Sequence, residues 1–174
     1  MNKAMPRYRF NRLTDITLED IERIGGKGLC LDVDNTTAYD CSKEFIPGVP
    51  QWIEDMKAKG MKMVILSNAV PKRAKWISGA LGIPAIGMSL KPMPWGYIKA
   101  AKMMGIKCSE MVVIGDQLFT DIRGGNIVGA ITVFVNPARK ETRNVKVFES
   151  RRRREKPILE EFDRINGVKA NEKG

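Results

Sequence analysis

The chain has 174 residues, of which 43% are hydrophobic and 29% charged, and its formal net charge is +10. This length suits one domain with a sizeable core, since roughly 100–200 residues per domain is usual. The composition excludes a disordered tail and a bundle of membrane helices. The longest apolar runs, such as residues 130–135, fall well short of the ~18 residues that a bilayer span requires.

Cysteine and histidine content narrows the available chemistry. Cys30, Cys41 and Cys108 form no CxxC pair and are odd in number, which indicates reduced thiols in a cytoplasmic setting rather than a disulfide framework or a zinc site. The chain has no histidine, which excludes Ser-His-Asp hydrolysis, histidine-ligated zinc and imidazole acid–base catalysis. Any catalysis therefore depends on carboxylates, lysines, hydroxyls and a hard cation.

Predicted helices and strands alternate along most of the chain. We expect helices over residues 18–24, 49–59, 71–82, 95–104 and 121–128, a loop over 37–47, and strands over 28–31, 61–66, 85–90, 111–114 and 130–135. This alternation of strands and helices is typical of right-handed βαβ units. The predicted fold class is α/β, a Rossmann-like doubly wound parallel sheet of about five strands with helices on both faces.

Two basic regions flank the predicted sheet. Residues 1–148 are expected to form one domain with a basic N-terminal arm that precedes the first acid, Asp15. Residues 149–174 are expected to form a basic amphipathic extension, because four arginines at 151–154 are followed by apolar residues at helical spacing. This extension is predicted to dock on the domain, to lie on an anionic membrane surface or to bind nucleic acid.

Polar side chains follow four of the predicted strands. They are Asp32 and Asp34, then Ser67 and Asn68, then Lys91, and finally Asp116 with Asp121. The carboxyl ends of parallel strands open onto one crevice, so we expect these groups to meet. Each alone suits a helix cap, a turn or a solvated lysine. Together they indicate a bound metal, because Asp32 and Asp34 would otherwise crowd like charges on one side of the strand.

These residues resemble the four signature motifs of the haloacid dehalogenase (HAD) superfamily. The motifs read Asp32-Val33-Asp34-Asn35-Thr36, Ser67-Asn68, Lys91-Pro92 and Gly115-Asp116-Gln117-Leu118-Phe119-Thr120-Asp121. The resemblance covers roughly residues 13–136. The short segment before Pro47 leaves no room for a large cap domain, as in subclass IIIA. The motif forms are similar to those of YqeG-type phosphatases, a group related to phosphatidylglycerophosphate phosphatases.

The resemblance implies a mechanism. Asp32 would attack phosphorus and form an aspartyl-phosphate, while Asp34 would protonate the leaving oxygen and then accept a proton from water. Ser67 and Asn68 would hold a phosphoryl oxygen, and Lys91 would place positive charge against the transferring group.

The resemblance also implies a Mg²⁺ cofactor. The ion would be bound by Asp32, Asp116 and the backbone carbonyl of Asp34, with Asp121 orienting a metal-bound water or approaching the ion directly. Asn35, Thr36 and Gln117 are expected to fix the geometry of the surrounding loops.

The leading functional hypothesis is a Mg²⁺-dependent phosphomonoester hydrolase that acts on a lipid phosphate such as phosphatidylglycerophosphate. We expect a cytoplasmic enzyme, with a peripheral position at the membrane as an open alternative. A phosphatase of nucleic-acid ends is a second hypothesis, although no aromatic stacking platform is evident. A non-catalytic RNA- or ribosome-binding protein is a third, and the intact acidic motifs count against it. Soluble sugar phosphates are a further substrate class.

Overall fold

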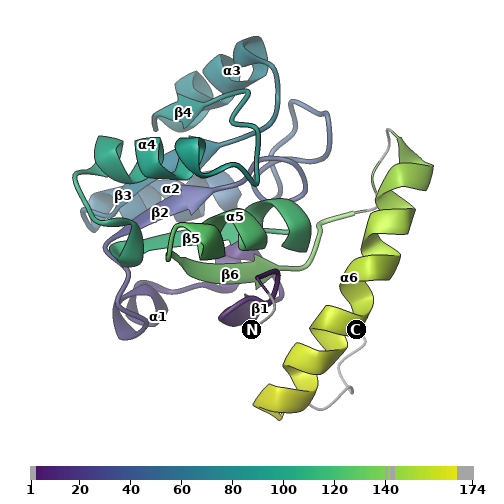
Figure 1. The fold of residues 1–174 in the computed structure, drawn as a ribbon. Coiled ribbons are helices and arrows are strands. Elements are labelled where there is room, and N and C mark those ends of the chain that lie inside the picture. The colour runs from purple at the N-terminus through teal and green to yellow at the C-terminus, as the bar shows by residue number, and fades with distance from the viewer. Residues whose placement is uncertain (1–2, 140, 142–143, 168–174) are drawn as a thin grey trace.

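The computed structural model describes residues 3–139, 141 and 144–167. Its centre is a parallel six-stranded sheet in the order β1-β6-β5-β2-β3-β4 (Figure 1). The strands are β1 (Tyr8–Phe10), β2 (Gly28–Leu31), β3 (Lys62–Leu66), β4 (Ala85–Ile86), β5 (Met111–Gly115) and β6 (Ile131–Val135). The predicted α/β class is confirmed, with one more strand than expected.

The additional strand is β1, which lies in the segment predicted to be a basic arm. Tyr8 pairs with Val133 and Phe10 with Val135. Three residues are too few to give an alternating pattern, so the sequence carries little signal for this strand. At the other sheet edge, β4 ends after Ile86, earlier than expected. Residues 88 and 90 have left-handed backbone angles, with φ of 46° and 54°, which a strand does not accept.

Helices cover both faces of the sheet. One face carries α1 (Leu18–Arg23), α2 (Val49–Ala58) and α3 (Pro71–Leu81), and the other carries α4 (Pro94–Met104) and α5 (Arg123–Ile127) (Figure 1). Successive side chains of a strand point to opposite faces of the sheet, so each strand contributes to the hydrophobic cores on both faces. In β2, Leu31 packs in the cluster that contains Ile53, whereas Cys30 packs in the cluster that contains Tyr97. The predicted doubly wound arrangement is therefore present.

Short turns of helix complete the connections. Two 3₁₀ turns, η1 (Leu13–Asp15) and η2 (Cys108–Glu110), precede α1 and β5. The helix expected over residues 121–128 is divided into a π-helical turn, η3 (Leu118–Ile122), and α5. This turn carries Asp121, so the irregular backbone lies at the predicted site.

The last helix, α6 (Val145–Asn166), docks against the sheet domain. Its residues Ile158, Leu159 and Phe162 pack in a cluster with Leu118 and Phe134. The apolar stripe of the basic segment therefore faces the domain, and the boundary expected at residue 148 falls within α6. Residues 168–174 of the predicted extension lie outside the described residues. Within the described ranges, no helix combines the length and apolar content needed to cross a bilayer.

Candidate active site

Asp32 is the first residue beyond β2 and is buried. Its backbone N–H donates to the carbonyl of Ile114 at 3.0 Å, so the ladder between β2 and β5 holds the aspartate in place. The chain then turns sharply. The N–H of Thr36 donates to the carbonyl of Val33 at 3.2 Å, and Asn35 has a φ of 60°. Asparagine tolerates this left-handed conformation better than most residues, which explains its place in the turn.

Lys91 lies at the centre of the site. Its Nζ donates to Oδ1 of Asp32 and, at 2.7 Å, to Oδ1 of Asp121. Burial alone would lower the pKa of this lysine, but the carboxylates of Asp121 and Asp32 outweigh that effect and raise its pKa. The lysine is therefore a fixed positive charge between two acids that lie far apart in the sequence.

Ser67 and Asn68 follow β3, and their side chains form hydrogen bonds with neighbouring segments of the chain. The Ser67 hydroxyl accepts a hydrogen bond from the N–H of Ala69 at 3.0 Å. The Asn68 side chain accepts from the N–H of Lys91 at 2.8 Å and from the Ser89 hydroxyl at 3.1 Å. In this arrangement, Asn68 positions the segment that carries Lys91.

Asp116 and Asp121 complete an acidic cluster. Carboxylate oxygens of Asp32, Asp116 and Asp121 all lie within 4.8 Å of one another, and all three residues are buried. Gly115 makes this approach feasible. A Cβ atom at residue 115 would lie 2.4 Å from Cγ of Asp121, so any side chain there would displace the acid.

Arg152 of α6 reaches into the cluster from outside the predicted motifs. Its Nη2 lies 2.5 Å from Oδ2 of Asp116 and 2.5 Å from Oε1 of Glu141, and its Nη1 lies 3.0 Å from Oε2 of Glu155. Its Nη1 also donates to the backbone carbonyl of Asp116. Glu155 in turn accepts from the N–H of Leu118 at 2.8 Å, which holds α6 against η3.

The cluster carries more negative than positive charge. Around Lys91 and Arg152, the described ion pairs gather five acids, namely Asp32, Asp116, Asp121, Glu141 and Glu155. Burial raises the pKa of Asp116 well above its usual value, and burial together with the charge of Asp32 raises the pKa of Asp121 to about 6. A further cation would relieve this repulsion.

Two buried carboxylate oxygens have no hydrogen-bond partner among the described residues. They are Oδ2 of Asp32 and Oδ1 of Asp116. A buried carboxylate oxygen without a partner is costly. The two atoms belong to two of the residues predicted to bind metal, so the donor set fits a hard divalent cation.

Asp34 lies beside the cluster, paired with an arginine. Its Oδ1 accepts from Nη2 of Arg73 at 2.7 Å and from the N–H of Cys41 at 3.0 Å. Burial, and next the charge of Asp32, raise the pKa of Asp34. A carboxyl group that holds its proton to a higher pH suits proton donation.

A cavity of about 510 Å³ opens over these residues. Asp32, Asp34 and Lys91 line it on the side of the sheet. Phe148 and Arg151 of α6 line another part, and Nη1 of Arg151 donates to Oε1 of Gln117 at 2.5 Å. The terminal helix therefore contributes directly to the candidate active site.

The site includes arginines that were not predicted as site residues, namely Arg73, Arg151 and Arg152, together with the unpredicted Glu141 and Glu155. A signal existed for Arg73, which lies in the first turn of the helix that follows Ser67 and Asn68. The arginines of α6 belong to a basic run that also suits a solvated or membrane-bound helix. Their sequence position alone does not indicate contact with Asp116.

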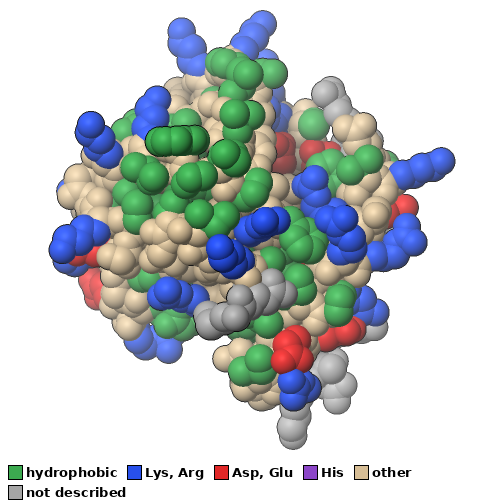
Figure 2. Space-filling view, viewed as in Figure 1, with side chains coloured by type: hydrophobic (Ala, Val, Ile, Leu, Met, Phe, Trp, Pro, Cys, Tyr) green, Lys and Arg blue, Asp and Glu red, His purple; other side chains and the backbone are tan. Residues whose placement is uncertain are grey.

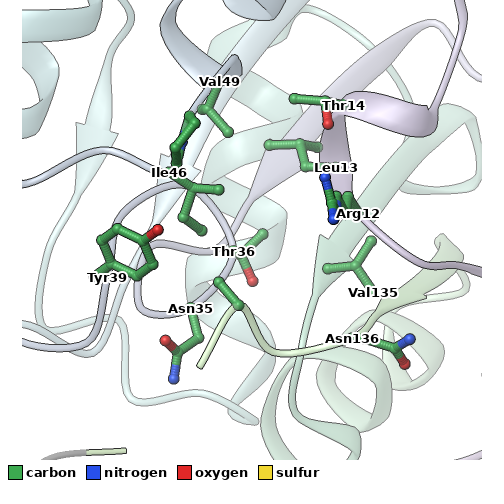
Figure 3. Close-up of a pocket in the computed structure, with 12 residues that line it drawn as sticks. Arg12, Leu13, Thr14, Asn35, Thr36, Tyr39, Ile46, Val49, Val135 and Asn136 are labelled. Carbon is green, nitrogen blue, oxygen red and sulfur yellow. The ribbon is translucent and has the colours of Figure 1, made fainter. Parts of the chain in front are cut away.

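A second cavity, of about 280 Å³, lies beside the turn after β2 (Figure 3). Thr36, Tyr39, Ile46 and Val135 line it. Asn35 lines both cavities, so both lie against this turn.

The fold and the site together define a phosphoryl hydrolase with a parallel α/β sheet. The family model for haloacid dehalogenase-like hydrolases matches residues 14–129, and the chain belongs to this family. It is an HAD-type phosphatase, and the described residues include no large cap domain, as the resemblance in the sequence implied. Residues of α6 lie outside the matched range.

Curated relatives are named phosphatases. The chain is 40% identical to the probable phosphatase YqeG of Bacillus subtilis over 122 residues, which span 70% of this chain and 71% of the relative. It is 28% identical over 143 residues to the chloroplastic phosphatidylglycerophosphate phosphatase 1 of Chlamydomonas reinhardtii. That match spans 77% of this chain and 53% of the relative.

Solved structures share the fold at low identity. The cobalt-bound deoxy-D-mannose-octulosonate 8-phosphate phosphatase of Haemophilus influenzae matches with a TM-score of 0.53 at 18% identity, over 64% of this chain and 69% of that chain. The D,D-heptose 1,7-bisphosphate phosphatase of B. bronchiseptica, solved with magnesium and phosphate, matches with a TM-score of 0.54 at 18% identity. That match covers 65% of this chain and 84% of that chain.

Proposed function

We propose that this phosphatase hydrolyses a lipid phosphate monoester through an aspartyl-phosphate at Asp32, with Mg²⁺ as cofactor. The observation that carries the mechanism is the environment of the Asp32 carboxylate. Lys91 binds Oδ1, whereas Oδ2 is buried and has no hydrogen-bond partner among the described residues. Asp32 also lines the main cavity, where a substrate phosphorus would be accessible to it.

The proposed reaction has two steps. A carboxylate oxygen of Asp32 attacks phosphorus, the ester P–O bond breaks, and Asp34 gives its proton to the leaving alkoxide oxygen. Water then attacks the same phosphorus while Asp34 accepts a proton from it. Cleavage of the bond between phosphorus and Asp32 releases inorganic phosphate. The position of Asp34 on the same cavity wall, at 30% side-chain exposure, supports its access to the leaving group and to water.

Asp32, Asp116 and the backbone carbonyl of Asp34 are the proposed Mg²⁺ ligands. The unpaired oxygens of Asp32 and Asp116 support this assignment, and so does the excess negative charge around Lys91 and Arg152. When bound, Mg²⁺ would neutralise charge on the phosphoryl oxygens and help to orient the phosphate. We assign Asp121 to orientation of Lys91, because these two side chains pair at 2.7 Å.

Ser67, Asn68 and Lys91 are proposed to prepare the site for the phosphoryl group. Lys91 offsets the charge of the acids that a phosphate dianion would otherwise meet. Asn68 acts through its hydrogen bonds to the backbone of Lys91, and Ser67 through the turn that it closes.

The lipid substrate class is supported by the named relatives from Chlamydomonas and Arabidopsis, both phosphatidylglycerophosphate phosphatases. The cavity is compatible with a bulky substrate, because no large cap domain covers it in the part of the chain that the structure describes. Arg73 and Arg151 also line this cavity and provide positive charge beyond Lys91.

A substrate panel tests the proposal. Phosphate release would be measured with Mg²⁺ from phosphatidylglycerophosphate in detergent micelles, from 5′- and 3′-phosphorylated oligonucleotides and from sugar phosphates. We expect the largest kcat/KM for the lipid phosphate. Preferred turnover of oligonucleotide ends or of sugar phosphates would overturn the lipid assignment and leave the phosphatase assignment intact. Salt-sensitive RNA binding without turnover of any substrate would instead favour a non-catalytic role.

A further inference from the structure

Large apolar side chains are exposed beside the active-site cavity. Six of them, each at least 46% exposed, lie on the segment from the start of α3 to the outer side of α4: Val70, Met88, Leu90, Met93, Trp95 and Ile98. We call this surface the apolar face. Figure 2 shows apolar side chains gathered over α4 and the segment that precedes it. Concentrations of exposed apolar groups in a folded protein mark interaction sites.

Helix α4 is apolar on both its inner and outer sides. Tyr97 and Ala101 are buried against the sheet. Trp95 and Ile98 point outward, together with the exposed Lys99 and Lys102 at helical spacing. A surface helix normally presents a polar outer side to water. The outer side of α4 instead combines apolar groups with lysines, which suits a boundary between water and an apolar phase.

The segment between β4 and α4 is held so that apolar residues point outward. Met88 and Leu90 have φ values of 46° and 54°, an unfavourable left-handed conformation for residues with side chains. The N–H of Met88 donates to the carbonyl of Ala69 at 2.9 Å, and Asn68 binds the N–H of Lys91 at 2.8 Å. These bonds fix Leu90, 67% exposed, directly next to the buried Lys91.

The segment that carries most of the apolar face has charged residues of one sign only. Residues 56–109 contain ten Lys and Arg residues and no Asp or Glu. The exposed members near the apolar face include Lys72, Lys75, Lys99 and Lys102. A partner that is complementary to this surface must present negative charge to the lysines and an apolar interior to the exposed hydrophobic side chains. An anionic lipid bilayer offers both, because lysines reach its phosphates while tryptophan and aliphatic groups enter the acyl boundary.

We propose that the apolar face docks onto an anionic bilayer and brings the active-site cavity to the level of the lipid headgroups. The proposal rests on the proposed lipid substrate. Val70 belongs to the face and also lines the cavity, so docking would place the cavity mouth at the membrane surface. Helix α6 is a poorer candidate for this contact, because its residues Ile158, Leu159 and Phe162 already pack against the domain.

Vesicle binding of the full chain tests the proposal. Co-sedimentation would be measured with vesicles of phosphatidylcholine alone and with about one third phosphatidylglycerol. The test variant is Leu90→Ser/Trp95→Ser/Ile98→Ser. The matched control is Val147→Ser/Ile165→Ser, because these two apolar residues of α6 are 59% and 63% exposed. We expect binding that requires the anionic lipid and weakens with salt, about ten-fold or more weaker in the triple variant and unchanged in the control.

Three further measurements separate docking from misfolding. Trp95 is 73% exposed, whereas Trp52 is 7% exposed, so the fluorescence of wild-type Trp95 should shift to the blue when anionic vesicles are added. A Trp95→Phe variant should lose most of this shift. The variant Lys99→Glu/Lys102→Glu, which alters exposed lysines alone, should also weaken vesicle binding. Turnover of a soluble phosphate monoester should stay at the wild-type level in the triple variant.

Several results would overturn the docking proposal. They are absence of wild-type binding to anionic vesicles, equal binding by the triple variant, loss of binding in the α6 control, or binding to RNA through this face without binding to vesicles. Failure of the proposed function would look different. In that case wild-type enzyme would bind vesicles through the apolar face and release no phosphate from the lipid substrate.

Discussion

The guanidinium of Arg152 lies 2.5 Å from the carboxylate of Asp116, a pairing that joins α6 to the end of β5 across 36 residues of sequence. Only one oxygen of Asp116 is used, since Oδ1 is buried without a partner among the described residues. Arg152 therefore leaves one oxygen available to a cation while it holds the other. We interpret Arg152 as a positioning residue for the proposed metal site.

Replacement of Arg152 tests this interpretation. Arg152→Ala should raise the Mg²⁺ concentration that half-saturates turnover by about 10–100-fold, because residues that orient metal ligands typically contribute this much to metal affinity. At saturating Mg²⁺, kcat should recover most of its wild-type value. Arg152→Lys, which keeps the charge, should lie between the two. Mg²⁺ titrations of phosphate release would provide the comparison, and an unchanged half-saturating Mg²⁺ concentration in Arg152→Ala would argue against the role.

Replacement of Lys91 should reduce turnover strongly but still allow the chain to fold. In Lys91→Met the buried acids Asp32 and Asp121 lose their shared cation. Phosphate release should fall about 10²–10³-fold, the usual effect of losing one preorganised charge-stabilising group. The midpoint of thermal unfolding should fall in EDTA and recover in part with Mg²⁺. Wild-type kcat/KM in Lys91→Met would contradict the assignment.

Gly115 should be intolerant of even one methyl group. In Gly115→Ala, the new Cβ would lie 2.4 Å from Cγ of Asp121, so the acid and its pairing with Lys91 must move. We expect a loss of about 1–3 kcal/mol in the free energy of unfolding and a large loss of activity. Gly79→Ala in α3 is the matched control, because no atom lies within 4 Å of its added methyl group. Helix propensity should make that control up to ~1 kcal/mol more stable. Equal urea midpoints for the two variants would show that the close approach is unimportant.

Metal removal should affect both activity and stability. EDTA should abolish phosphate release, and Mg²⁺ should restore it. Binding to the folded state should also raise stability, by about 2.7 kcal/mol at a Mg²⁺ concentration 100 times the Kd. This gain should shrink in Asp116→Asn. Full turnover after exhaustive EDTA treatment, with no effect of Mg²⁺ on thermal unfolding, would exclude the proposed cofactor.

The sheet was predictable because strand ends carry clear local signals. The runs before Asp32 and Asp116 are apolar on both sides, as expected for buried parallel strands, and their polar ends meet in space. The resemblance of the four motifs to those of the HAD superfamily made the family predictable as well. No comparable signal existed for β1, whose three residues depend on pairing with β6.

The role of α6 was harder to predict, for a physical reason. Helical spacing of Ile158 and Phe162 shows that the helix buries one side, but it does not reveal the surface that it contacts. The contacted surface is visible only in long-range contacts of the structure, such as the packing of Phe162 in the cluster of Phe134 and the Arg9–Asp163 pair at 2.6 Å. A basic amphipathic helix that docks on its own domain therefore has the same sequence pattern as one that binds a membrane surface.

The most direct test is the turnover of Asp32→Asn measured beside wild type on one soluble phosphate monoester with saturating Mg²⁺. The substitution keeps the size of the side chain and removes the nucleophilic charge. We expect phosphate release to fall about 10³-fold or more, with a circular dichroism spectrum that matches wild type. Turnover close to the wild-type rate in the folded variant would contradict the assignment of Asp32 as the phosphate acceptor.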